Sequence, residues 1–481
     1  MRLPSLRPAP AVALLAALAA CATNPVTGER ELSLMSEEQE VAIGQQYDAE
    51  IRKQMRPYED AGLQRYVQGV AARLAAGSHR PDLPWHFTVV DVPAVNAFAL
   101  PGGYIYMTRG ILAYLNDEAQ LAGVLGHEIG HVTARHAAQQ YTRATGGQLG
   151  LIALGIFVPE ARPFGQLAEA GLSLLFLKHG RDDELQADRL GVEYTAKTGW
   201  DPDAVPGFLN TLARMNEETD RSGIPNWLAT HPQPGDRVAE AREAIAKLGV
   251  PADGRVARDE YLRQIDGIVF GDNPEDGLVR GDEFVHPGML FAVRFPADWQ
   301  ISNSAEQVVA KDPRADRFML LQLEQAQQGG NVEQVAVASM QKRGLQLIEG
   351  GRGRINGLEA FVGTYRGQMQ DLGDVGVRGA HILHGDRLFL LVGLTPAGAF
   401  QSAVETFTRT IGTFRPMSRA EAADIHPNRV DLYTVRQGDT WQAIAERHGG
   451  VVPPSTLAII NDYAPGDQPR AGQRIKIVVT G

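Results

Sequence analysis

One short stretch of the chain carries the residue types and spacing of a metal-dependent hydrolytic centre. Residues 127–131 read His-Glu-Ile-Gly-His. Each helical residue turns by about 100°, so His127 and His131 share one face and can bind one zinc ion. Glu128 lies one step round, where its carboxylate can hold a metal-bound water and take its proton. The pattern predicts attack of an activated water on a polarised carbonyl.

The residues around this motif have the apolar character that a buried metal helix needs. Residues 121–132 contain five large apolar side chains (Leu121, Val124, Leu125, Ile129 and Val132) and three glycines (Gly123, Gly126 and Gly130). Each glycine inside a helix costs about 1 kcal/mol relative to alanine, which indicates close approach by another element or ordinary tight helix packing. The competing interpretation is a chance occurrence of the motif in a histidine-containing helix.

A third protein ligand is required for zinc, and His136 is the nearest candidate in the sequence. It follows His131 by five positions and His127 by nine. It therefore lies roughly 140° and 180° away around a continuing helix. A longer motif with a histidine six residues after the second one also fails, because that position is Ala137. We interpret His136 as a packing or surface histidine.

Two carboxylates on a later helical segment are better candidates. Glu184 and Asp188 are four positions apart in RDDELQADRLG. One carboxylate can bind zinc while the other accepts a hydrogen bond from a ligand histidine and fixes its orientation. The competing interpretation is a charged, solvent-facing helix surface, since Arg181 and Arg189 lie in the same stretch. Periodicity leaves both interpretations open.

Four motifs, in chain order, resemble one known family. They are NAFALPGGYIYMTRG, LGHEIGHVTARH, RDDELQADRLG and THP followed by Arg237. Together they resemble the zinc metallopeptidase family of CAAX prenyl endopeptidase, HtpX and BepA, and its periplasmic lipoprotein branch in particular. The resemblance implies a mainly helical, zincin-type (gluzincin) domain with a small β-sheet. It also implies these site residues: zinc ligands His127, His131 and Glu184, general base Glu128, and supporting Asp188 and Arg237.

The same resemblance implies roles for two further segments. His231 would approach the metal, either holding it latent or aiding the transition state; the alternative is a loop histidine that precedes a helix. Residues 96–107 would form an edge strand to which an extended substrate adds by β-augmentation, with a plain core hairpin as the alternative. The expected substrate contacts are Asn96, Ala97, Phe98, Ala99, Leu100, Pro101, Gly102 and Gly103.

The N-terminus has the features of a secretory leader. Arg2 and Arg7 precede an apolar run over residues 11–20, which is too short for an ordinary membrane helix. The run ends in Leu-Ala-Ala before Cys21, the only cysteine of the chain. This resembles the lipobox of a bacterial lipoprotein and implies cleavage before Cys21, lipidation of its thiol and anchoring at the outer membrane. A plain secretory signal is the alternative.

The chain closes with a segment that resembles a LysM module. YTVRQGDTWQAIAERHGG, over residues 433–450, and AGQRIKIV near the end carry the resemblance. It implies a βααβ order and binding of peptidoglycan through its N-acetylglucosamine units. The longer stretch over residues 451–470 departs from the tightest LysM pattern, so a docking or spacer domain is the alternative.

These patterns predict an α+β multidomain protein. We expect a leader over residues 1–20, a zinc metallopeptidase domain over 21–250, a linker over 251–283 and a LysM-like module over 432–479. Residues 284–417 alternate strand-like runs with helices, which favours an antiparallel-sheet α+β domain with a weak resemblance to the PsbP/Mog1-like fold.

Composition narrows the function further. The 481 residues carry a formal net charge of −11 and show no long basic block, so we expect no binding to nucleic acid. The implied function is a periplasmic, lipid-anchored endopeptidase with one Zn²⁺ ion, which cuts extended segments of misfolded or mislocalised envelope proteins. The alternatives are a latent, chaperone-like binder and a peptidoglycan-associated scaffold.

Overall fold

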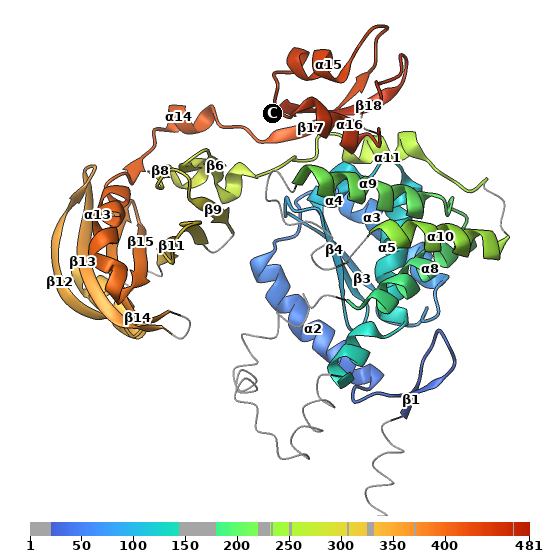
Figure 1. The fold of residues 1–481 in the computed structure, drawn as a ribbon, viewed down its shortest axis with the longest axis horizontal. Helices are drawn as coiled ribbons and strands as arrows, with labels where there is room; N and C mark the ends of the chain where they lie inside the picture. Colours follow the sequence, from blue (N-terminus) through green and yellow to red (C-terminus); the bar gives the residue numbers. More distant parts are fainter. Residues whose placement is uncertain are drawn as a thin grey trace, which may run out of the picture. The chain divides into compact units, whose positions relative to one another are not determined.

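The fold was taken from a computed structural model (Figure 1). It describes residues 21–143, 179–219, 231, 234–249, 253–304, 307–324, 331–369, 372–464 and 466–481, so the predicted leader over residues 1–20 lies outside it. The chain divides into two compact units. Unit 1 runs to Phe270 and also contains Arg429–Thr480, and unit 2 is Gly271–Asn428. Among the helices of the described ranges, none combines the length and apolarity needed to cross a membrane.

Unit 1 is mainly helical and contains a small three-stranded sheet, as predicted, besides two separate pairs of strands. The sheet has the order β3-β5-β4, with β3 parallel and β4 antiparallel to the central β5. β4 therefore lies at one edge and β3 at the other. The elements are β1 (Cys21–Thr23), β2 (Arg30–Leu32), α2 (Glu37–Gln54), α3 (Ala61–Ala76), β3 (His86–Val90), β4 (Ala97–Leu100), β5 (Tyr104–Thr108), α4 (Arg109–Tyr114), α5 (Glu118–Thr133), α8 (Arg181–Lys197), α9 (Ala204–Thr219), α10 (Pro234–Leu248) and α11 (Arg258–Ile265).

Helices α5 and α8 pack closely because glycines face each other at their contact. A Cβ atom added to Gly126 would lie 3.1 Å from the carbonyl oxygen of Gly191. One added to Gly130 would lie 3.1 Å from the carbonyl oxygen of Ala187. The element that approaches the glycine-rich helix closely is α8, and the contact is a tight helix packing, so it fits both interpretations of the glycines.

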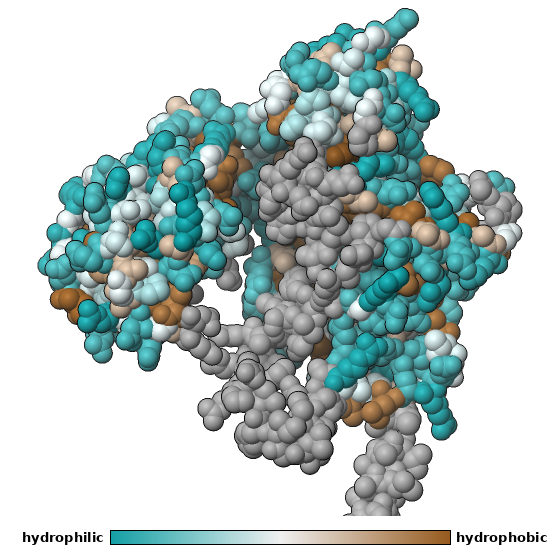
Figure 2. All heavy atoms as spheres, viewed as in Figure 1, coloured by the Kyte–Doolittle hydropathy of each residue, from teal (hydrophilic) through white to brown (hydrophobic). Residues whose placement is uncertain are grey.

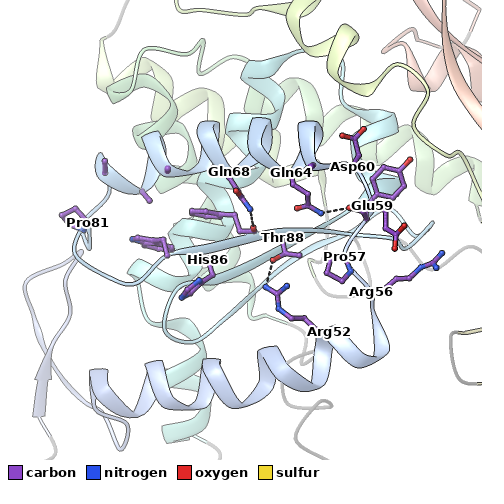
Figure 3. Close-up of a pocket in the computed structure, with 17 residues that line it drawn as sticks. Arg52, Arg56, Pro57, Glu59, Asp60, Gln64, Gln68, Pro81, His86 and Thr88 are labelled. Atoms are coloured by element: carbon purple, nitrogen blue, oxygen red, sulfur yellow. Dashed lines mark hydrogen bonds between the residues drawn. The ribbon is translucent and has the colours of Figure 1, made fainter.

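The two edges of the sheet differ. At β3, the side chain of Gln64 donates to Val89 O (2.7 Å) and accepts from Val89 N (2.9 Å), as a neighbouring strand would. Gln68 donates to Phe87 O at 3.2 Å. A cavity of about 1030 Å³ lies beside this edge (Figure 3), and no residue of the His127 motif lines it. Glutamine side chains from α3 thus form hydrogen bonds with backbone groups at the β3 edge, which a neighbouring strand would otherwise use.

The LysM-like segment has the predicted βααβ order and belongs to unit 1. Its elements are β17 (Asn428–Thr434), α15 (Trp441–Arg447), α16 (Pro454–Ile460) and β18 (Arg474–Thr480), and β17 pairs with β18. Ile459 and Val430 join the same hydrophobic core as the metal-motif helix. The Nζ atom of the buried Lys476 donates to Ala113 O at 2.9 Å and to Leu115 O at 2.5 Å, directly before α5.

The segment expected as a linker, residues 251–283, contains elements of both units. Tyr261, Leu262 and Ile265 of α11 are buried in the core of unit 1. The hydroxyl of Tyr261 donates to Leu112 O at 2.5 Å. The segment is polar on average, so the sequence did not predict that these three apolar residues are buried. They lie on one side of a helix of only eight residues.

Unit 2 has the predicted antiparallel-sheet α+β character. A seven-stranded sheet has the order β12-β13-β14-β15-β11-β10-β9, and a four-stranded sheet has the order β16-β8-β7-β6. The strands are β6 (Leu278–Arg280), β7 (Glu283–His286), β8 (Phe291–Arg294), β9 (Gln300–Asn303), β10 (Gln307–Lys311), β11 (Phe318–Glu324), β12 (Gln346–Ile355), β13 (Leu358–Met369), β14 (Gly373–His384), β15 (Arg387–Pro396) and β16 (Arg415–Pro416). The helices are α12 (Val332–Lys342), α13 (Phe400–Ile411) and α14 (Arg419–Ala423).

Hydrophilic residues dominate the face of the molecule that Figure 2 shows, and hydrophobic residues are scattered over it. The apolar side chains gather instead in separate cores of the two units. The largest core surrounds α5, so the helix that carries the metal motif is buried along its whole length.

Candidate metal centre

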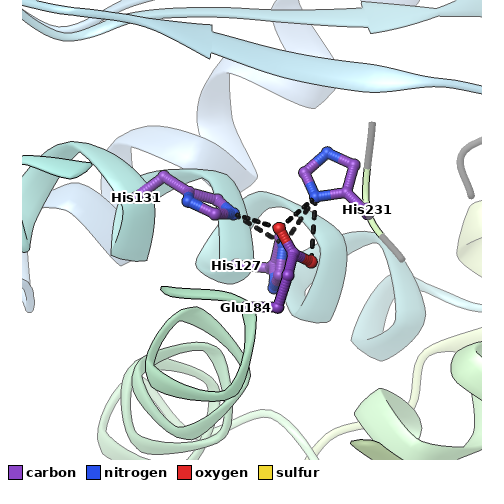
Figure 4. Close-up of side chains that lie close together, drawn as sticks. All are labelled: His127, His131, Glu184 and His231. Carbon is purple, nitrogen blue, oxygen red and sulfur yellow. Dashed lines mark hydrogen bonds and ion pairs between the residues drawn. The ribbon is translucent and has the colours of Figure 1, made fainter. Parts of the chain in front are cut away.

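Four buried side chains converge on one point, as Figure 4 shows. His127, His131, Glu184 and His231 each offer a ligand atom, and these atoms all lie within 4.8 Å of one another. The Nε2 atoms of His127 and His131 are 3.0 Å apart. Oε1 of Glu184 lies 3.5 Å from Nε2 of His131 and 2.9 Å from Nδ1 of His231. Three imidazoles and one carboxylate are a donor set suited to zinc.

Two helices position three of these four side chains. His127 and His131 lie one turn apart on α5, whose N-cap Asp117 accepts a hydrogen bond from Gln120 N. Glu184 lies in the first turn of α8, where the positive end of the helix dipole favours a carboxylate. The glycine contact between α5 and α8 brings Glu184 within reach of the two histidines, as the motif resemblance implied.

The buried charges of the centre fit a divalent cation. Three carboxylates are at most 1% exposed, on Glu128, Glu184 and Asp188, and one guanidinium, on Arg237, is 2% exposed. With all four groups ionised and the histidines neutral, the sum is three negative charges and one positive charge, which leaves −2. Buried charges need compensation, and a Zn²⁺ ion would supply it.

Asp188 and Arg237 contact two of the candidate metal ligands, His127 and Glu184. Oδ1 of Asp188 lies 2.9 Å from Nδ1 of His127, so this carboxylate can hold the imidazole with Nε2 toward the metal. Arg237 donates to both oxygens of Asp188, at 2.6 and 2.7 Å, and its Nη1 lies 2.9 Å from Glu184. Burial raises the pKa of Asp188, but the charge and hydrogen bonds of Arg237 outweigh this and lower its pKa below the ordinary value.

Glu128 and His231 face each other across the centre. Oε1 of Glu128 lies 3.8 Å from Nε2 of His231. Burial raises the pKa of Glu128, which brings its proton affinity closer to that of a general base working near neutral pH. Burial lowers the pKa of His231, but Glu184 and Glu128 outweigh it and the net pKa is raised. His231 thus lies among the donors, within 3.3 Å of Nε2 of His127.

His136 is a buried packing histidine outside the metal cluster, as interpreted, but the direction expected for its side chain is wrong. We expected it to face away from the other histidines on a continuing helix. Helix α5 instead ends at Thr133, and Arg135 adopts a left-handed conformation with φ of 61°. This turn brings the buried His136 back, so that its Nδ1 atom lies 2.8 Å from Nδ1 of His131. His136 does not belong to the four-residue cluster.

His179 is a second histidine that the sequence did not indicate. Its ring stacks on that of His131 with centroids 4.0 Å apart. Burial, followed by the charge of His231, lowers the pKa of His179 to about 3. Together with Ala99, Leu100 and Pro101 of the predicted edge-strand segment, His179 and His131 line a small hollow. Its ring also stacks on that of His231, with centroids 5.6 Å apart. No sequence motif includes His179, because these contacts join segments that are far apart in the chain.

Comparisons with known proteins agree with this geometry. Residues 61–245 match Peptidase family M48, and residues 433–478 match the LysM domain. A Beta-barrel assembly-enhancing protease of Yersinia pestis is 34% identical over 234 residues, which cover 47% of each chain. Its counterpart in Escherichia coli (strain K12) is 32% identical over 248 residues, 50% of each chain. The chain thus spans about half the length of these relatives.

A solved structure resembles part of the chain more remotely. A cyanobacterial PsbP from Synechocystis is 12% identical, with a TM-score of 0.25, over 29% of this chain and 95% of its own. That score carries no argument about the middle domain, whose PsbP/Mog1-like resemblance stays a prediction. The convergent donors and the two sequence matches do settle the other parts: the chain carries a metallopeptidase domain of Peptidase family M48 over residues 61–245 and a LysM domain over residues 433–478.

Proposed function

We propose that the chain is a zinc-dependent endopeptidase. The observation that carries this proposal is the convergence of His127, His131 and Glu184 within ligand distance, with Glu128 beside them in a buried position. When bound, Zn²⁺ polarises the scissile carbonyl and acidifies a water molecule. The protein holds the three ligands rigidly, since they lie on two helices in close contact.

Glu128 performs the proton transfers in this mechanism. Its carboxylate takes a proton from the attacking water and returns it to the leaving nitrogen of the peptide bond. Burial raises the pKa of Glu128, which suits both steps, because the same oxygen must accept and release a proton near neutral pH. A protein that only binds polypeptides has no use for a buried carboxylate at this position.

His231 supports a latent state of the same enzyme. Its Nδ1 atom lies 2.9 Å from Glu184 and 3.3 Å from Nε2 of His127, among the donor atoms of the metal ligands. A fourth protein ligand there would occupy the position that water needs. Two roles remain for His231: a latch that leaves the metal when substrate binds, or a donor that stabilises the oxyanion after it moves.

Substrates are proposed to be extended polypeptide segments that add to β4. The hollow lined by Ala99, Leu100, Pro101 and His131 connects this edge of the sheet with the metal helix. The opposite edge, β3, is occupied by Gln64, so β4 is the better candidate for β-augmentation. Such binding selects misfolded or mislocalised proteins, because folded ones rarely offer a free extended segment.

The proposed location is the periplasmic face of the outer membrane. It rests on the lipobox-like sequence before Cys21 and on the relatives, whose name describes a protease that enhances β-barrel assembly. The LysM domain supports contact with peptidoglycan. A latent, chaperone-like or peptidoglycan-associated binder is the second candidate, and the position of His231 among the metal ligands is the observation that favours it.

Bound zinc and casein cleavage in Glu128→Gln and His231→Ala variants test the proposal. We expect Glu128→Gln to retain zinc and to lose roughly 10²–10⁴-fold in cleavage rate, the range for a general base. Glu59→Gln, on an exposed residue, is the matched control and should cleave like wild type. Equal cleavage by wild type and Glu128→Gln would refute the mechanism. His231→Ala should cleave faster if His231 is a latch and more slowly if it aids the transition state.

A further inference from the structure

The ligand histidine His131 has its second ring nitrogen on another histidine. Nδ1 of His131 lies 2.8 Å from Nδ1 of His136, and both rings are buried. Nε2 of His136 in turn lies 3.0 Å from Oε1 of Gln186, a residue of α8. The three side chains therefore form a hydrogen-bonded chain that starts at α8 and ends at a metal ligand.

The direction of this chain follows from which atoms can donate. A neutral imidazole carries one N–H donor and one nitrogen acceptor, and an amide oxygen only accepts. Nε2 of His136 must therefore carry the proton, and Oδ1 of Asp183, 4.0 Å from the same atom, favours this too. Nδ1 of His136 is then an acceptor, so Nδ1 of His131 must donate to it. This leaves Nε2 of His131 without a proton.

We propose that His136 and Gln186 are positioning residues that fix His131 in the tautomer able to bind zinc. The inference rests on the zinc site of the proposed function. It gives His131 what Asp188 gives His127: an acceptor at Nδ1, 2.9 Å away in that case, which keeps Nε2 free for the metal. Here the acceptor is neutral, so His131 is oriented without another negative charge in the centre.

The backbone after α5 is built for this contact. Arg135 has a left-handed φ of 61°, an uncommon conformation for a residue with a side chain. Its guanidinium holds the turn by donating to Glu40 at 2.5 Å and to Met35 O at 2.7 Å. The turn aims His136 back at His131, whereas a continuing helix would have pointed it away.

Zinc affinity, measured by competition with a chelator, tests whether His136 positions His131. His136→Leu removes the acceptor at Nδ1 of His131 and should weaken zinc binding about 10–100-fold, the usual effect of losing such a partner. His136→Asn places an amide oxygen near the lost nitrogen and should recover most of the affinity. His381→Leu, which removes a buried histidine of unit 2, is the matched control and should bind zinc like wild type. Equal affinities of wild type and His136→Leu would overturn the inference.

A spectroscopic readout keeps the inference testable if the His136→Leu chain does not fold. In ¹⁵N-histidine NMR of the wild-type chain without zinc, His136 should carry its proton on Nε2 and His131 on Nδ1. The Nδ1–H tautomer of His136 would overturn the inferred hydrogen-bonded chain from Gln186 through His136 to His131. Failure of the proposed function is a different result: wild type would then bind no zinc at one ion per chain, whatever the tautomer of His136.

Discussion

Replacing Arg237 by methionine tests how the buried charges of the metal centre are balanced. The guanidinium is 2% exposed and donates to both oxygens of Asp188, at 2.6 and 2.7 Å. Its Nη1 atom also lies 2.9 Å from Glu184. Methionine keeps much of the length of arginine and removes the charge, so the two carboxylates lose their common cation while the packing changes little.

The expected loss of stability is large because both carboxylates that lose the Arg237 cation are buried. Removing one partner of a buried ion pair costs about 3–5 kcal/mol. In a domain of this size, a loss of 1 kcal/mol lowers the melting temperature by about 2–4 °C. We therefore expect the zinc-free Arg237→Met chain to melt roughly 6–20 °C below wild type. Saturating zinc should reduce this difference, since a divalent cation compensates the same carboxylates.

Thermal unfolding of unit 1, followed in chelator and in excess zinc, measures both effects. Arg181→Met is the matched control, because that arginine is exposed and its pair with Asp236 lies at the surface. Such pairs contribute at most about 1 kcal/mol. Adding Asp188→Asn to Arg237→Met removes one stranded charge and should restore part of the loss. A loss below about 1 kcal/mol for Arg237→Met in chelator would refute the charge balance.

Two further predictions concern groups outside the metal centre. The buried His381 has no hydrogen-bond partner for either ring nitrogen within the described residues, and burial lowers its pKa to about 4. Unfolding raises that pKa toward the ordinary value of about 6.5, so unit 2 should lose roughly 3 kcal/mol of stability between pH 6.5 and 4. Urea unfolding at several pH values should show this loss in wild type and not in His381→Phe; equal pH dependence would contradict it. Burial also lowers the pKa of Lys476, so the folded state holds this proton less tightly than the unfolded chain. The stability of unit 1 relative to Lys476→Met should therefore rise from neutral pH toward pH 10, and a pH-independent difference in thermal unfolding would contradict the prediction.

The local part of the site could be predicted from the sequence, since helix geometry alone places residues four apart on one face. His127, Glu128 and His131 follow from that rule and lie where it puts them. The distant carboxylate could not be derived this way. Glu184 and Asp188 fitted a solvent-facing helix as well as a metal site, and only the motif resemblance favoured the metal.

Helix periodicity rightly kept His136 out of the ligand set, but it placed the side chain wrongly because the helix ends before it. His136 was excluded by rotating it around a helix that continues past Thr133, but the chain turns at Arg135. A left-handed residue is usually glycine or asparagine, so an arginine there gives no warning in the sequence. The buried Tyr261 in the expected linker was missed for a related reason, because α11 is too short and too polar on average for this residue to be recognised.

The docking of the LysM domain was also not predictable from its own motif. Lys476 reads as an ordinary exposed residue of a terminal strand, yet its Nζ binds carbonyl groups of the segment that leads into α5. Buried lysines are rare unless their charge is compensated or their pKa is lowered. Its burial therefore indicates a fixed contact between the domains of unit 1, and not a LysM domain on a free tether.

The position of helix α8 gives a reason for the glycines at its contact with α5, although glycine destabilises a helix. Three of its residues reach the α5 histidines: Glu184 as a proposed ligand, Asp188 behind His127, and Gln186 through His136. A single helix can serve both ligands only if it lies almost in backbone contact with α5. Side chains at the crossing would separate the two helices and lengthen all three contacts together. Each helical glycine destabilises its helix by about 1 kcal/mol. This loss accompanies the close packing that lets one neighbouring helix orient both histidines.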